Sequence, residues 1–180
     1  MRIREENMNF WFIQAIGAVA LIFVFFSWNA KTRKSILVLQ SINIVFFIAH
    51  YLLLSAFIGA VMCLIVLGRN IVLYLKDKGK KWASHPAWFY ALTLVAVGVL
   101  AVAWTGWISA LPVIGVSIGM YGMWHDRPAD IRFYMLISAI IWIPYTIAVQ
   151  SYSGLLNQAV ATIAILIGMY RHDRREIPLP

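Results

Sequence analysis

Residues 87–124 read AWFYALTLVAVGVLAVAWTGWISALPVIGVSIGMYGMW, and this stretch decides the fold. It contains no charged residue, which is typical of a segment that lies in the hydrocarbon core of a membrane. A single helix of this length would be nearly twice as long as the core is thick, because each residue adds about 1.5 Å and the core measures about 30 Å. We therefore expect two membrane helices, 87–105 and 107–124, that meet at a turn at Thr105-Gly106.

The rest of the 180-residue chain has the same character. Hydrophobic residues make up 62% of the whole chain. Charged residues make up 12%, well below the roughly 25% of charged residues in a soluble domain. Five more apolar runs are long enough to cross a bilayer: 9–28, 35–54, 56–75, 132–150 and 153–170. The sequence predicts an all-α fold, a polytopic membrane helix bundle of about seven transmembrane helices in a single membrane domain, 1–180. Six spans is the alternative count.

The positive charges lie in alternate connections between these runs. Basic residues follow the first, third, fifth and seventh runs: Lys31, Arg33 and Lys34; Lys76, Lys78, Lys80 and Lys81; Arg127 and Arg132; Arg171, Arg174 and Arg175. The connections around Leu54-Ser55, Thr105-Gly106 and Ser151-Tyr152 carry none. Because basic loops stay in the cytoplasm, we expect the N-terminus outside and the C-terminus inside the cell. The net charge of +8 then indicates attraction to an anionic membrane surface rather than to nucleic acid.

The chain matches itself when it is shifted by about 95 residues. This shift aligns Trp28 with Trp124, Tyr51 with Tyr145, Gly59 with Gly154 and Tyr74 with Tyr170. We expect two parallel three-helix repeats, 9–75 and 107–170, joined by a linker helix, 87–105, and followed by a cytoplasmic tail, 171–180.

This order of helices resembles the architecture of the SWEET and PQ-loop transporters, in which two parallel repeats surround a central path. Those families carry a Pro-Gln pair near the cytoplasmic end of the first helix of each repeat. The corresponding positions here are Ser27-Trp28-Asn29 and Met123-Trp124-His125. The departure weakens any transfer of a sugar substrate to this chain.

A closer resemblance runs almost end to end, to the YgjV-type bacterial inner membrane proteins. The residues that carry it are Trp11 to Gly17, His50-Tyr51-Leu52-Leu53, Arg69, Leu111 to Gly115, and Trp142 to Gly154. The resemblance implies a multi-pass protein of the bacterial inner (plasma) membrane. It implies no substrate and no mechanism.

Polar side chains within the apolar runs are the candidates for function, because a polar group in a membrane costs free energy unless it is paired. Gln40, Asn43 and His50 share one helix face, which indicates either a water-lined path or hydrogen bonds between helices. Arg69 is the one clearly intramembrane charge, and no Asp or Glu lies in any run. Its long stem reaches toward the headgroups, or it faces the bundle and needs a neutral acceptor, a lipid phosphate or an anionic ligand.

Other features have two readings each. His50, near the outer end of its helix, is either a proton-coupling group or a structural hydrogen-bonding residue. Pro112 and Pro144 permit kinks of the kind that line transporter sites, although prolines are also ordinary in membrane helices. Gly115 and Gly119 favour close helix packing, and the interior Trp142 is best read as a packing residue.

We see no motif of an enzyme, no cofactor motif and no metal-ligand spacing, and the single cysteine, Cys63, cannot form an internal disulfide. The leading hypothesis is a transporter or facilitator of a small polar or anionic solute, working by rocking of one bundle against the other. The alternative is a non-transporting membrane protein that binds a partner helix or anionic lipid. Expected partners are the lipid bilayer, a small polar solute and a second copy of the chain, but no nucleic acid. The candidate path residues are Gln40, Asn43, His50, Arg69, Tyr145, Asn157 and Gln158.

Overall fold

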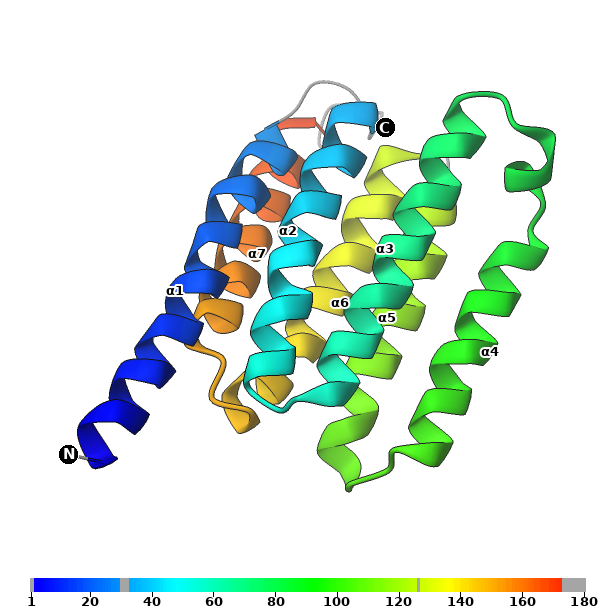
Figure 1. Ribbon diagram of the computed structural model, residues 1–180. Helices are drawn as coiled ribbons and strands as arrows, with labels where there is room; N and C mark the ends of the chain where they lie inside the picture. Colours follow the sequence, from blue (N-terminus) through cyan, green and yellow to red (C-terminus); the bar gives the residue numbers. More distant parts are fainter. Residues whose placement is uncertain (1, 30–32, 126, 173–180) are drawn as a thin grey trace.

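The computed structural model describes residues 2–29, 33–125 and 127–172, and within them the chain is helical throughout apart from short turns (Figure 1). The elements are α1 (Arg2–Asn29), α2 (Arg33–Leu53), α3 (Phe57–Asp77), the 3-10 helix η1 (Lys81–Ser84), α4 (Ala87–Val102), α5 (Trp107–Trp124), α6 (Pro128–Ala148) and α7 (Tyr152–His172). Successive α-helices run in opposite directions, so that α1 begins and α7 ends at opposite ends of the bundle (Figure 1). The predicted all-α membrane bundle is confirmed.

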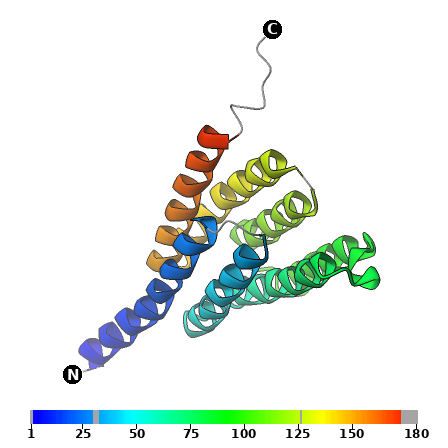
Figure 2. The same ribbon diagram turned by 90° about the horizontal axis from the view of Figure 1, so that it is seen from above.

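Six of the helices form a closed ring. Each of α1, α2 and α3 packs against the next, as do α5, α6 and α7, and the ring closes through contacts of α3 with α5 and of α1 with α7. Seen from above, α1 lies beside α7, and α5 lies beside α6 (Figure 2). The helix α4 stands outside this ring, at the rim of the bundle, where it contacts α3 and α5 (Figure 1).

The helix α4 is shorter than the sequence predicts. It ends at Val102 rather than near residue 105, and its 16 residues give a length of about 24 Å. The other six α-helices each contain a segment that is long and apolar enough to cross a membrane, as judged over the described residues. The turn at Gly106, which has a φ of +120° that favours glycine, separates α4 from α5 where we expected it.

Apolar side chains cover the outside of the bundle as well as its core. On α4, Leu94 is 73% exposed and Val102 is 91% exposed. Two pairs of tryptophans flank this helix, Trp82 with Trp88 at one end and Trp104 with Trp107 at the other. A soluble protein rarely leaves so much apolar surface uncovered, whereas tryptophans at both ends of an apolar helix are typical of membrane proteins.

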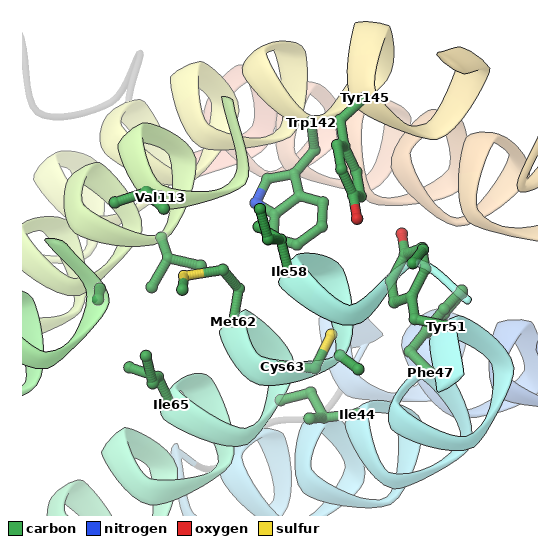
Figure 3. Packing of buried hydrophobic residues seen from close by; sticks show 14 of the residues in the cluster. Ile44, Phe47, Tyr51, Ile58, Met62, Cys63, Ile65, Val113, Trp142 and Tyr145 are labelled. Carbon is green, nitrogen blue, oxygen red and sulfur yellow. The ribbon is translucent and has the colours of Figure 1, made fainter. Parts of the chain in front are cut away.

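The core lies between the two halves of the ring, around α3 and α6. Tyr51, Trp142 and Tyr145 meet there, with ring centroids 5.6 to 6.1 Å apart (Figure 3). Met62 of α3 is fully buried beside them. This aromatic cluster joins α2 of the first half to α6 of the second.

Basic residues collect at one end of the bundle. Arg33, at the start of α2, forms an ion pair of 3.1 Å with Asp77, at the end of α3. The ammonium groups of Lys34 and Lys78 lie over the ring of Tyr74. We call this the basic end; the turns at the opposite end contain no Lys or Arg.

The same hydrogen bonds occur in both halves of the chain, 95 residues apart. Asn43 of α2 donates a bond of 2.8 Å to the carbonyl of Ala20, and Ser138 of α6 donates one of 2.8 Å to the carbonyl of Gly115. The turns that follow α2 and α6 are also alike, because Ser55 and Gln150 both adopt a left-handed backbone with φ of 57° and 54°.

This spacing places the two halves in a defined register. In the turn after α2, the amide of Ala56 donates to the carbonyl of Tyr51 over 2.8 Å, and in the turn after α6 the amide of Ser151 donates to Thr146 over the same distance. Tyr51 therefore has Thr146 as its counterpart. The alignment of Tyr51 with Tyr145 that the sequence suggested is off by one residue.

Candidate functional site: a polar cavity inside the ring

A cavity of about 140 Å³ lies inside the ring, and all six ring helices contribute to its walls. Its size is close to that of an engineered protein cavity of about 150 Å³ that holds benzene, so it fits a molecule of about six heavy atoms. Most of the wall is apolar, including Phe47 and Trp142. We call it the central cavity. The polar side chains that line it are Gln40, Asn43, Arg69, Ser138, Asn157 and Gln158.

Five of the seven predicted path residues are therefore brought together, from helices far apart in the sequence. Gln40 and Asn43 come from α2, Arg69 from α3, and Asn157 and Gln158 from α7. His50 and Tyr145 are not among the lining residues. Pro112 and Pro144, which lie within α5 and α6, do not line the cavity either.

Asn43 shows that one side of the polar stripe holds helices together. Its amide donates to the carbonyl of Ala20 and also to the side-chain oxygen of Asn157, over 3.0 Å. The residue thus links α2 to α1 and α7. Asn43 therefore both joins neighbouring helices and forms part of the cavity wall.

Gln40 differs, because its side-chain oxygen is buried and accepts no hydrogen bond from any residue that the structure describes. The residue is 7% exposed and faces the cavity. A buried acceptor that makes no hydrogen bond costs about 1–3 kcal/mol. The described residues therefore supply no donor for this oxygen of Gln40.

Arg69 faces the bundle and does not extend toward the headgroups. It is 3% exposed and lines the cavity, and its Nε and Nη2 groups donate to the side-chain oxygen of Asn70 over 3.1 and 2.8 Å. Among the described residues, the carboxylates that form ion pairs are Asp77 and Asp130, with Arg33 and Arg127. Arg69 thus has only a neutral amide to offset its charge, which is a costly arrangement for a buried cation.

The comparison with known families adds the class of protein. A family model described as bacterial inner membrane protein, YgjV, matches residues 11–176, which include most of α1 and all the helices from α2 to α7. The chain belongs to the YgjV family. No curated protein and no solved structure matches it, so the likeness to SWEET and PQ-loop transporters rests on helix order alone.

In this YgjV-family protein, His50 has a structural contact of its own. It is fully buried, with Nδ1 2.9 Å from the carbonyl of Ile13 and Nε2 2.8 Å from the hydroxyl of Ser151. A carbonyl can only accept, so Nδ1 carries the proton and Nε2 accepts from Ser151. Both ring nitrogens of a neutral imidazole are then satisfied. This geometry supports the structural reading of His50.

Tyr145 makes a similar contact from the second half of the chain to the first. Its hydroxyl accepts a bond of 2.8 Å from the amide of Gly59, in the first turn of α3. His50 thus joins the first half to the turn before α7, and Tyr145 joins the second half to the start of α3. In the register defined above, these two residues are counterparts. We call this pair of contacts, at the end opposite the basic end, the clasp.

Sequence reasoning missed Gln14 and Ser153, which extend the clasp. The Gln14 amide donates to the carbonyl of Gln150 over 2.9 Å and accepts from the amide of Ser153 over 3.1 Å. A glutamine inside the apolar run 9–28 was the available signal. Its partner on α7 lies far along the chain and gives no signal of its own.

Trp142 packs and also lines the cavity, so its packing reading is confirmed but incomplete. A side chain added at Gly115 would come within 2.7 Å of the Trp142 ring, which shows how closely α5 and α6 approach. The close packing expected at Gly115 and Gly119 is confirmed. Cys63, the one cysteine of the chain, also lines the cavity.

Proposed function

We propose that this YgjV-family protein moves a small polar or anionic solute across the inner membrane through the central cavity. The observation that carries the proposal is a buried arginine without an acidic partner among the described residues, facing a cavity lined by six helices. Arg69 lies eight residues from the end of α3, and Asn43 ten residues from each end of α2. At about 1.5 Å per residue, these groups are about 12 and 15 Å from the helix ends, the depth at which transporters bind solutes.

The arrangement of the two halves supports this function. Lining residues 95 positions apart come from helices on opposite sides of the ring, such as Asn43 with Ser138, Phe47 with Trp142, and Cys63 with Gln158. The proposal treats 9–75 and 107–170 as parallel repeats, with α4 as their linker. A solute site between equivalent surfaces is reached from either side when one half rocks against the other.

The proposed orientation follows from the charges. With the basic end in the cytoplasm, the clasp lies at the outer face and the N-terminus is outside. Single cysteines introduced in a Cys63→Ser background at Tyr152 and at Lys80, both exposed, test this. On intact cells, an impermeant thiol reagent should label the first and spare the second. Labelling at Lys80 alone would reverse the orientation.

Solute flux into liposomes tests transport. The purified protein should give a flux that Asn43→Leu and Arg69→Leu each abolish or strongly reduce, while the exposed Arg127→Gln variant retains it. A flux that both cavity variants leave unchanged would argue against the central cavity as the path.

One observation favours a second function, the binding of anionic lipid or a partner helix. Lys78, Lys80 and Lys81 lie exposed at the basic end. Each basic residue near the surface contributes about 1 kcal/mol of attraction to an anionic leaflet. Replacing all three by glutamine should reduce retention of anionic lipid, or recovery of a protein partner, during purification. If neither changes, this second function loses its basis.

A further inference from the structure

The cavity offers an unbalanced positive charge to whatever binds there. Arg69 uses Nε and Nη2, both toward the same oxygen of Asn70, and its Nη1 group makes no hydrogen bond to a described residue. A guanidinium presents its donors in a planar fork that matches a carboxylate. A bound carboxylate would neutralise the buried charge that the described residues leave uncompensated.

Gln40 adds a second requirement. Its buried oxygen accepts no hydrogen bond within the described part of the chain, and Gln40 lines the same cavity as Arg69. A ligand satisfies it with a hydroxyl or an ammonium donor. An ammonium group would bring back the unbalanced positive charge, since no Asp or Glu lies in the membrane runs. A neutral hydroxyl fits both groups at once.

Size and surface set the remaining limits. A volume of about 140 Å³ admits about six heavy atoms. The walls beyond the polar groups are apolar, formed by residues such as Ile44, Phe47 and Trp142, so the body of the ligand is a short hydrocarbon.

We propose that the central cavity binds a small hydroxycarboxylate, with its carboxylate on Arg69, its hydroxyl donating to Gln40 and its carbon chain against Phe47 and Trp142. This deepens the proposed function and rests on it for the meaning of the site, although binding is measured without transport. Four probes separate the contributions. Lactate has the carboxylate and the hydroxyl, propionate lacks the hydroxyl, 1,2-propanediol lacks the charge, and alanine replaces the hydroxyl by an ammonium group.

The experiment is thermal unfolding of the purified full-length protein in detergent at increasing probe concentration, since a ligand that binds the folded state raises the midpoint. Lactate should bind about tenfold more tightly than propionate, because propionate leaves Gln40 without a donor. Alanine and 1,2-propanediol should bind more weakly still. Equal binding of 1,2-propanediol and lactate, or no binding of any probe, overturns the proposal.

Variants assign the two contacts. Arg69→Gln should remove the preference for lactate over 1,2-propanediol, and Gln40→Leu should make lactate and propionate equal. The matched control is Thr93→Val on α4, since the Thr93 hydroxyl is also buried without a partner among the described residues but does not line the cavity. Undiminished lactate binding by Arg69→Gln overturns the assignment. If a cavity variant does not fold, the order of the four probes on the unaltered protein still decides.

Flux measurements separate the two proposals. Lactate binding in the predicted order without lactate flux into liposomes contradicts transport and leaves the ligand class standing. If the protein transports a neutral solute but does not bind lactate, the hydroxycarboxylate proposal is contradicted and the transport proposal still holds.

Discussion

Replacing Tyr145 by phenylalanine should weaken the clasp by a calculable amount. Tyr145 is 3% exposed, and its hydroxyl is the acceptor for the amide of Gly59, 2.8 Å away. That amide lies in the first turn of α3, where helical amides have no acceptor within the helix. Phenylalanine keeps the ring packed against Trp142 but leaves a buried N–H without a partner.

The expected loss follows from the environment of this bond. A buried donor without a partner costs about 1–3 kcal/mol, and single hydrogen bonds in membrane proteins reach about 1.7 kcal/mol at most. We therefore expect Tyr145→Phe to lower the free energy of unfolding by about 1–2 kcal/mol. In a chain of 180 residues, each kcal/mol lost from the free energy of unfolding lowers the midpoint of thermal unfolding by about 2–4 °C. The midpoint should therefore fall by about 2–8 °C.

The assay is thermal unfolding in detergent, followed by tryptophan fluorescence. The matched control is Tyr152→Phe, because Tyr152 is 52% exposed and the same hydroxyl is removed from a surface position. Its midpoint should stay within about 1 °C of the unaltered protein. If Tyr145→Phe unfolds at the same temperature as the control, the bond to Gly59 contributes nothing and the clasp is not a stabilising contact.

Three further predictions test the packing and the polar contacts. Gly115→Ala should lower stability by about 1–3 kcal/mol, because its new methyl group would lie 2.7 Å from Trp142, whereas Gly98→Ala, with nothing within 4 Å, should not. His50→Leu should destabilise the protein by about 2 kcal/mol or more in the same melt, since Ile13 and Ser151 lose their shared partner; an unchanged midpoint would contradict the bonding described. A double-mutant cycle of Arg33→Gln with Asp77→Asn should give a coupling below about 1 kcal/mol, because both side chains are about one-third exposed; a coupling of several kcal/mol would show that this ion pair is shielded.

The ends of most helices could be predicted from the sequence. The thickness of the membrane sets the length of each apolar run, and charged residues are confined to the connections between runs. Arg69 and Gln40 were identified for the same reason, since polar residues stand out in an apolar run. The end of α4 was not predictable, because residues 102–105 continue the apolar pattern while the backbone leaves the helix at Ala103.

The contacts of His50 and Tyr145 needed the structure. Helical periodicity places a residue on a face of its own helix, but it does not give the neighbour that this face meets. His50 shares a face with Gln40 and Asn43, yet it lies near the end of α2 and reaches Ser151 instead of the cavity. The pairing of Gln14 with Ser153 is equally invisible, since 139 residues separate them.

The central claim is that the six ring helices line a cavity which admits small anions, and Cys63 tests it most directly. It is the one cysteine of the chain and it lines the cavity, so no introduced cysteine is needed. The measurement is the rate at which Cys63 of the folded protein reacts with iodoacetate, compared with iodoacetamide, a neutral reagent of the same size, each rate divided by that of the same reagent with a free thiol in solution.

We predict that iodoacetate has the higher normalised rate, that Arg69→Gln removes this preference, and that lactate slows the reaction. Equal normalised rates for the two reagents with no protection by lactate would contradict the claim. So would a Cys63 that reacts only after the protein is unfolded.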